Sequence, residues 1–391
     1  MNYFLTETEQ MIKDTAREVA QKYIKPVAAE YDEKNEFAWD VQEKIAEAGL
    51  CGVYIPETYG GICPEGQMGI MNLVVAVEEL SKVCGGISLG LAATALGTIP
   101  LILFGNEEQK QKYLPAIAAG EKLAAFALTE ACAGSNAGGI QTTARKEGDY
   151  YILNGTKQWI TNGNVAEMYT VIAMTDKTRG ARGATAFLVD KGTPGFSFGK
   201  KENKMGIRAS STYELVFEDC KIPASAILGK EGHGFLSAMK TFDMSRPGVA
   251  AQALGIAAGA LEDAVDYART REQFGKPVIS NQGLRFLLAD MAMKVETARA
   301  MVYATARSID SGDRNCSKES AIAKCYASDV AMQVTTDAVQ VFGGYGYMKE
   351  YPVEKMMRDA KILQIYEGTN QIQRDIIGLA LNKEYAAVTK R

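Results

Sequence analysis

Apolar residues recur every three or four positions near the start of the chain, the period of an amphipathic helix. Thr6 and Glu9 stand just before this stripe with the spacing of a capping box, so the first helix is expected to begin there. The same period returns over 71–84 and, in shorter form, over 109–122. The pattern predicts an all-helical region over 1–125. The first stripe consists of Ile12, Ala16, Val19, Tyr23 and Val27.

The pattern changes near Phe126, where short apolar runs separated by turn residues replace the helical period. Strands are expected over 150–157, 169–174, 184–190 and 213–219. Asn154-Gly155 lies inside the first run and predicts a hairpin turn at that point. The region 126–234 is therefore expected to form a middle β domain, either a barrel or a sandwich.

The helical period returns at Phe235 and predicts helices over 235–270, 282–310, 317–342 and 369–385. We interpret 235–391 as a C-terminal four-helix bundle. The order α, then β, then α indicates an α+β multidomain fold. A Rossmann fold would alternate strands and helices and would carry G-x-G-x-x-G after a strand, and this chain shows neither pattern.

The run 87–104 has no charged residue and approaches the length that spans a membrane. Gly90, Gly97, Thr98 and Pro100 interrupt it, so we expect a buried helix followed by a turn, and no membrane span.

Composition excludes several classes of function. The 391 residues include 43 Lys and Arg against 47 Asp and Glu, a balance that does not favour binding to nucleic acid. His233 is the sole histidine, and the seven cysteines are scattered, so no metal site is expected. The N-terminus lacks the basic and apolar segments of a signal peptide, and we expect a cytoplasmic protein.

Six short segments carry candidate chemistry. They are Thr-Glu-Ala-Cys-Ala-Gly-Ser-Asn at 129–136, Trp-Ile-Thr-Asn-Gly at 159–163, Arg-Glu-Gln-Phe-Gly-Lys at 271–276, Gln-Val-Phe-Gly-Gly-Tyr-Gly at 340–346, Arg-Asp-Ala at 358–360 and Ile-Tyr-Glu-Gly-Thr at 365–369. Taken in order, they resemble the signature segments of acyl-CoA dehydrogenases of the short- and medium-chain, butyryl-CoA dehydrogenase-like type. The resemblance extends from about residue 5 to residue 385.

The resemblance implies an FAD-dependent enzyme that converts an acyl-CoA thioester into the trans-2-enoyl-CoA. Glu367 would take the α-proton, flavin N5 would take the β-hydride, and an electron-transfer flavoprotein would receive the electrons. The backbone N–H of Glu367 would hold the thioester oxygen. Some relatives carry the base at the position of Ser245, which cannot serve here. The family also implies a homotetramer, a dimer of dimers.

The residues present suit these roles. Trp159 offers a flat face to a flavin ring, Thr161 offers a hydroxyl and a backbone N–H, and Arg271 can bind a pyrophosphate through two hydrogen bonds. In the family, 271–276 and 340–346 reach the FAD of a neighbouring subunit. The expected FAD-binding residues are Phe126, Leu128, Thr129, Ser135, Trp159, Ile160, Thr161, Arg271, Phe274, Gln282, Gln340, Val341, Gly343, Gly344, Thr369 and Gln371. The expected substrate-binding residues are Ser135, Asp243, Arg246, Tyr366 and Gly368.

The chain departs from the family at two positions of the first turn: Ala131 replaces a proline and Asn136 replaces an aspartate. The lost charge puts any ion pair of that aspartate in doubt, whereas the turn itself is expected to remain.

Other activities stay open at this point. The same residues would serve an enoyl-CoA reductase that runs the reaction backwards, an acyl-CoA oxidase, or a protein that binds an acyl-CoA or flavin without catalysis. A branched or cyclic acyl group is also compatible with the small residues Gly90, Ala92, Ala93 and Ala95. A dicarboxylic substrate is disfavoured because no charged residue occurs between Lys82 and Glu107. Leu91 stands where relatives that form cyclic dienes carry an aspartate base, which favours ordinary 1,2-dehydrogenation.

Overall fold

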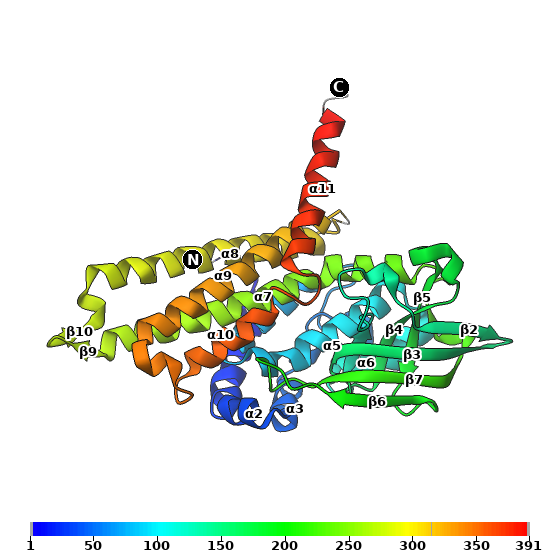
Figure 1. Cartoon of the computed structure of the whole chain (residues 1–391), viewed down its shortest axis with the longest axis horizontal. Coiled ribbons are helices and arrows are strands. Elements are labelled where there is room, and N and C mark those ends of the chain that lie inside the picture. The colour runs from blue at the N-terminus through cyan, green and yellow to red at the C-terminus, as the bar shows by residue number, and fades with distance from the viewer. Residues whose placement is uncertain (1–2, 314, 389–391) are drawn as a thin grey trace.

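The computed structural model describes residues 3–313 and 315–388 of the chain. It places a helical region first, a β-sheet next and a set of long helices last, with the sheet at one end of the molecule and most of the length of the C-terminal helices extending toward the other end (Figure 1). The expected α, β, α order is confirmed.

Local sequence signals define the ends of the N-terminal helices. The Thr6 hydroxyl accepts a hydrogen bond from the Glu9 backbone N–H at 3.2 Å, and the Glu9 carboxylate accepts one from the Thr6 N–H at 2.8 Å, which is the expected capping box. A π-helical turn over Ala20–Ile24 continues the first helix. The helices are α1 (Glu7–Val19), α2 (Ala28–Lys34), α3 (Trp39–Glu47), α4 (Ile70–Ser81), α5 (Gly85–Phe104) and α6 (Glu107–Ala118).

Helix α5 contradicts the expectation of a helix followed by a turn, since it runs unbroken through Pro100. By length and composition this helix could cross a membrane, yet 72% of its most apolar window is buried inside the fold. Gly97 lets α5 approach strand β1 (Ala124–Ala127) closely, because a Cβ there would lie 2.7 Å from the Ala125 nitrogen. We therefore interpret α5 as a core helix.

The middle region forms one eight-stranded sheet in which the strands follow the order β6-β7-β3-β2-β4-β5-β8, with β1 paired to β4. The strands after β1 are β2 (Thr143–Glu147), β3 (Tyr150–Thr161), β4 (Met168–Met174), β5 (Ala184–Asp190), β6 (Phe196–Lys201), β7 (Thr212–Pro223) and β8 (Ile227–Leu228). A short hairpin in the C-terminal region adds β9 (Glu272–Gln273) and β10 (Lys276–Pro277).

The hairpin expected at Asn154-Gly155 is wrong, because β3 continues through both residues and the reversal from β2 occurs between Glu147 and Tyr150. Pairing with β7 explains the difference. The Asn154 side chain donates to the Asp219 carboxylate at 3.1 Å and accepts from the Asp219 N–H at 2.8 Å. Gly155 lies at a bulge in this pairing. Contacts between distant strands thus outweigh the local turn preference.

The C-terminal helices are α7 (Gly234–Thr270), α8 (Gln282–Asp310), α9 (Ser317–Phe342), α10 (Pro352–Ile362) and α11 (Asn370–Val388). Helix α7 is buried along most of its length and packs against α4, α5, α8 and α9. Helix α10 was not among the expected helices, although Pro352 at its first position is a typical start signal. Helix α11 projects away from the rest of the molecule (Figure 1).

Candidate active site

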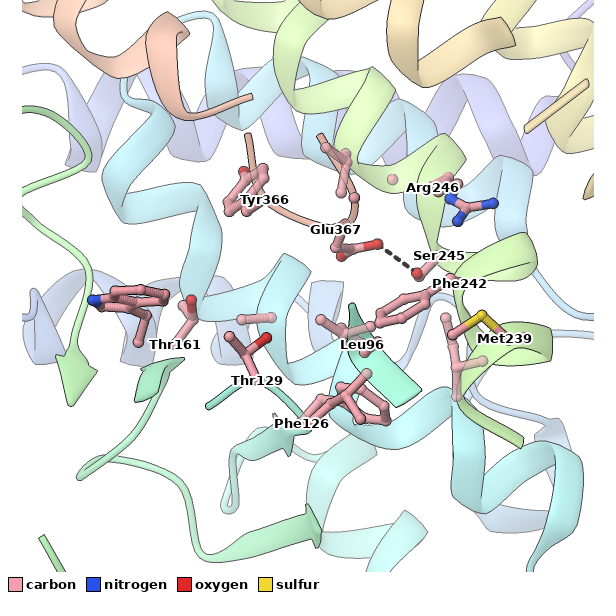
Figure 2. A pocket seen from close by; sticks show the side chains of 18 of the residues that line it. Leu96, Phe126, Thr129, Thr161, Met239, Phe242, Ser245, Arg246, Tyr366 and Glu367 are labelled. Atoms are coloured by element: carbon pink, nitrogen blue, oxygen red, sulfur yellow. Dashed lines mark hydrogen bonds between the residues drawn. The ribbon is translucent and has the colours of Figure 1, made fainter. Parts of the chain in front are cut away.

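A cavity of about 480 Å³ lies where α5, α7, the end of β3 and the loop before α11 meet. Its walls combine an apolar part, a group of hydroxyl and aromatic side chains, and one acidic side chain (Figure 2). Of the expected site residues, those that line it are Phe126, Leu128, Thr129, Ser135, Trp159, Ile160, Thr161, Arg246, Tyr366, Glu367 and Gly368.

Glu367 lies on the loop between α10 and α11, and the main chain of this loop has an unusual conformation. Glu367 has a φ of 49° and Gly368 a φ of 90°, both in the left-handed region. A non-glycine residue there is strained and persists only where the surroundings hold it. The side-chain amide of Gln373 donates to the Glu367 carbonyl at 3.1 Å and to the Gly368 carbonyl at 2.9 Å. The backbone carrying Glu367 is therefore fixed.

The Glu367 carboxylate points toward α7, where the Ser245 hydroxyl donates to its Oε2 at 2.7 Å (Figure 2). Burial raises the pKa of Glu367 above its usual range, while the Ser245 hydrogen bond and the charges of Arg246 and Lys324 act in the opposite direction. A carboxyl group with a raised pKa is a better proton acceptor once ionised. Among the described residues that line the cavity, Glu367 is the one carboxylate.

Tyr366 is held by the neighbouring helix α7, because its hydroxyl donates to the Gln252 side-chain oxygen. Burial raises the pKa of Tyr366 well above its usual value, so the phenol stays neutral. Gln252 in turn donates to the Gly85 carbonyl at 2.7 Å. This chain of hydrogen bonds ties the Glu367 loop to the start of α5.

Trp159, Ile160 and Thr161 form the end of β3, where a bulge interrupts its pairing with β7. Trp159 has a φ of 57° and is 54% exposed, so one face of the indole is available to a ligand. Asn162, also in the left-handed region, is fully buried and donates to Thr94 Oγ1 at 3.1 Å and to the Ala124 carbonyl at 3.2 Å. Asn162 thereby anchors the Trp-Ile-Thr segment to α5 and β1.

The turn at 129–136 is supported by a buried ion pair. Lys157 Nζ, which is 0% exposed, lies 2.8 Å from Glu130 Oε1 and donates to the Leu128 carbonyl at 3.0 Å. The Glu130 carboxylate also accepts from the Gln141 and Thr142 backbone N–H groups. Burial opposes ionisation of Glu130, but these partners outweigh it and lower the pKa of that carboxyl.

Two hydrogen bonds between Glu130 and Ala133 close the same turn, so it forms despite Ala131. Asn136 lines the cavity beside Ser135.

The apolar part of the cavity lies between α5, β1 and α7. Phe126 packs edge-on against Phe242, with 5.6 Å between ring centroids, and Leu96 and Met239 lie nearby (Figure 2). Ala92, Ala93 and Ala95 line the cavity as expected from their small size. Gly90 does not line it, because this glycine faces Gln42.

Asp243 and Arg246 form a buried pair 3.2 Å apart on α7. Arg246 lines the cavity, whereas Asp243 does not. Burial lowers the pKa of Arg246 and raises that of Asp243. Within the part of the chain that the structure describes, Arg246 Nε has no hydrogen-bond partner. A buried guanidinium with an unused donor beside a cavity can bind an anionic group of a ligand.

The remaining expected FAD residues lie away from this cavity. Arg271, Val341, Gly343 and Gly344 line a second cavity of about 500 Å³ where the end of α7 meets the end of α9. The Arg271 guanidinium lies 5.2 Å from the Tyr345 ring centroid. The hairpin next to this cavity is at the end of the helical bundle far from the sheet (Figure 1). Within one chain, the expected FAD-binding residues that line a cavity thus fall into two separate groups.

Six expected site residues line neither cavity. Phe274 is 96% exposed, and Gln282, Gln340 and Gln371 are exposed as well. Thr369 accepts a hydrogen bond from the Ile372 N–H at 3.3 Å and so caps the first turn of α11. The sixth is Asp243, which is buried in its pair with Arg246.

Sequence reasoning missed several residues of the site. Met239 and Val249 line the cavity at helical spacing from Phe242 and Arg246, and this periodicity could have found them. Ser245 was considered as a base and dismissed, but its contact with Glu367 was not foreseen. Lys324 and Gln373 approach the Glu367 loop from other helices, and no local signal marks them.

Family models match three consecutive parts of the chain. The acyl-CoA dehydrogenase N-terminal domain matches residues 6–121, the middle domain residues 125–220 and the C-terminal domain residues 232–381. The short-chain specific acyl-CoA dehydrogenase of Clostridium acetobutylicum is 48% identical over 378 residues, which are 96% of this chain and 98% of that protein. The 3-(aryl)acrylate reductase of Clostridium sporogenes is 43% identical and covers 97% of this chain and 100% of its own.

Solved structures agree with these matches. Butyryl-CoA dehydrogenase from Megasphaera elsdenii superposes with a TM-score of 0.94 at 49% identity and covers 97% of this chain and 100% of its own. A chain solved in work on the electron transferring flavoprotein of Acidaminococcus fermentans and flavin-based electron bifurcation has a TM-score of 0.94 at 53% identity. It covers 97% of this chain and 99% of its own.

Proposed function

The chain belongs to the acyl-CoA dehydrogenase family, whose members are FAD-dependent oxidoreductases, and we propose that it oxidises an acyl-CoA thioester to the trans-2-enoyl-CoA with Glu367 as the base. One observation carries this proposal. Glu367, the one carboxylate among the described residues that line the cavity, has a raised pKa and a fixed backbone, and the apolar part of the cavity and the Trp159–Thr161 segment lie on either side of it (Figure 2).

In the proposed reaction, the Cα–H and Cβ–H bonds break and a carbon–carbon double bond forms. Glu367 takes the α-proton as the ionised carboxylate, oriented by the Ser245 hydroxyl. FAD, when bound, supplies the acceptor for the β-hydride at its N5 atom. We assign the thioester oxygen to the Glu367 backbone N–H, where a donor would stabilise the developing enolate.

The cavity suits both ligands in its chemistry. Trp159 supplies a flat apolar surface and Thr129, Ser135 and Thr161 supply hydroxyls, which fits a flavin ring with a polar edge. The unused Arg246 donor fits an anionic part of CoA. The apolar walls fit an acyl chain, and the absence of a cation between Lys82 and Glu107 disfavours a dicarboxylic one.

We further propose that FAD is shared between two subunits. The group at Thr129–Thr161 and the group around Arg271, Gly343 and Gly344 belong to separate cavities of one chain. If each FAD uses the first group of one chain and the second group of another, the exposed Phe274, Gln282 and Gln340 become interface residues. We propose a homotetramer built from two such dimers, in the cytoplasm.

We propose an electron-transfer flavoprotein as the redox partner, supported by the 53% identical chain from work on such a flavoprotein. The second candidate function is reduction of an enoyl-CoA by the same residues in reverse. It is favoured by the similarity to a 3-(aryl)acrylate reductase. Both directions use the same acid–base group, Glu367, and the same flavin.

The test is to purify the protein, record its visible spectrum, and add acyl-CoAs of four to twelve carbons together with branched and cyclic ones under anaerobic conditions. We expect a bound flavin that loses its colour with at least one saturated acyl-CoA. Peroxide formation in air would indicate an oxidase. A flavin that no acyl-CoA reduces, while a reduced flavin is oxidised by an enoyl-CoA, would favour the reductase.

A further inference from the structure

Lys324 lies on α9, next to the loop that carries Glu367, and its side chain is 0% exposed. Its Nζ donates to the Gly368 carbonyl at 2.8 Å and to the Asn370 side-chain oxygen at 3.0 Å. The ammonium therefore holds the residue that directly follows Glu367 and the first residue of α11.

Lys324 differs from the other buried lysines in its partners. Lys157 lies 2.8 Å from the Glu130 carboxylate, and Lys355 lies 2.6 Å from the Asp359 carboxylate. Across residues 3–313 and 315–388, no carboxylate lies within 4.0 Å of Lys324 Nζ. Burying an ammonium without a neighbouring anion is unfavourable for folding. Stability alone does not explain why a lysine stands here.

The charged and titratable groups around Lys324 and Glu367 come from several helices and from the Glu367 loop. Those that face Glu367 are Arg246 from α7, Lys324 from α9 and Tyr366 from its own loop. Those that face Lys324 are Glu367, Cys325, Arg246 and Asp329. Asp329 forms its ion pair with Arg374, at 2.5 Å, and accepts from Asn370. Glu367 is the carboxylate that interacts most strongly with Lys324.

We propose that Lys324 is a positioning residue for Glu367, which fixes the strained loop through the Gly368 carbonyl and stabilises the ionised base by its charge. The inference rests on the proposed function of Glu367 as a base. Lys324 acts through the loop and does not line the cavity, so it touches neither reactant.

The titration of the two groups gives the direction of the effect. Burial lowers the pKa of Lys324 to about 8, so the ammonium is mostly protonated at neutral pH. Burial raises the pKa of Glu367, and the charge of Lys324 opposes that rise. Removal of the charge must therefore make Glu367 harder to ionise. The pH at which Glu367 becomes an active base moves upward, by about one unit for a nearby opposite charge.

The test compares Lys324→Gln with wild type, Lys324→Arg and Lys318→Gln, all as FAD-loaded protein. Gln keeps a donor for the Gly368 carbonyl but removes the charge, and Arg keeps the charge. Lys318 is on the same helix and pairs with Glu384 at 2.6 Å, away from the loop, so Lys318→Gln is a control for lost charge. The rate of flavin reduction is measured against pH. Infrared difference spectroscopy follows the protonated-carboxyl band that Glu367→Gln lacks, in the absence of substrate.

In Lys324→Gln we expect the midpoint of the pH–rate profile and the midpoint of the infrared carboxyl band to rise by about one pH unit each. Below its midpoint, flavin reduction should therefore be about tenfold slower than in wild type. Lys324→Arg and Lys318→Gln should keep the wild-type midpoints. Unchanged midpoints in Lys324→Gln would overturn the inference, even with a lower rate. Failure of Lys324→Gln to fold would also overturn it, since the fold itself would then require the amine. A wild-type protein whose flavin no acyl-CoA reduces would instead refute the proposed function.

Discussion

Replacement of Glu367 by Gln removes the proposed base while it changes little else. The amide has nearly the same size as the carboxylate, and its oxygen can still accept the hydrogen bond of the Ser245 hydroxyl, 2.7 Å from Oε2 in the wild type. The Gln373 amide holds the backbone carbonyls of the loop independently of the residue-367 side chain. We therefore expect the variant to fold and to bind FAD and acyl-CoA as the wild type does.

The size of the effect follows from the surroundings of Glu367. General-base catalysis contributes about 10²- to 10⁴-fold. No other acidic side chain is placed to take over as the base. Among the described residues no other carboxylate lines the cavity, and Asp243 is buried in its pair with Arg246. We expect flavin reduction to slow by at least about 10³-fold, or about 4 kcal/mol in activation free energy.

The assay is rapid mixing of the oxidised enzyme with a good acyl-CoA substrate, with absorbance of the flavin as the readout. The spectral change on binding of the product enoyl-CoA controls for ligand affinity. Ser245→Ala is the matched control, because it removes a hydrogen bond to the carboxylate and leaves the base in place. Its rate of flavin reduction should fall far less than that of Glu367→Gln. If Glu367→Gln reduced its flavin within tenfold of the wild-type rate, Glu367 would not be the base, and Asp243 would become the next candidate.

Three other predictions follow from the site and the fold. Arg246→Ala should raise the Michaelis constant for acyl-CoAs of all lengths alike, because we assign the guanidinium to CoA; a loss confined to one chain length would place Arg246 in the acyl pocket. Arg271→Ala should weaken FAD binding more than tenfold, as expected for a hydrogen bond to a charged group, measured by flavin retention on dilution. An Arg271→Ala monomer with full FAD would contradict sharing between subunits. Lys157→Met should lower the free energy of unfolding, measured by urea denaturation, by about 3–5 kcal/mol, because Glu130 then stays buried without its cation. The control Lys112→Met, which breaks the exposed pair with Asp190, should lower it by less than about 1 kcal/mol.

Signals carried by neighbouring residues were sufficient to predict most of the helices and strands. The C-terminal helices expected over 235–270, 282–310 and 317–342 are observed as Gly234–Thr270, Gln282–Asp310 and Ser317–Phe342. The strand expected over 184–190 is observed as Ala184–Asp190. Periodicity and capping act within one or two turns of chain, so the sequence displays them directly.

The expectations failed where distant contacts overrode a local preference. Asn154-Gly155 has strong turn propensity, yet β3 continues through it because β7, some 65 residues away, pairs with it and exchanges hydrogen bonds with Asn154. Pro100 does not end α5, which is enclosed by the surrounding fold. Propensity is a weak signal when a buried element gains packing on several sides.

The sequence by itself determined the order of the elements, the family, the cofactor, and the identity of Glu367 as the candidate base, because short segments with fixed spacing carry that information. The tertiary structure alone decided how the base is surrounded. Ser245 is 122 positions before Glu367, and Lys324 is 44 positions before its partner Gly368. Only folding brings these groups within hydrogen-bond distance. Burial of Glu367 raises the pKa of the carboxyl on which the proposed reaction depends, and Ser245 and Lys324 oppose that rise.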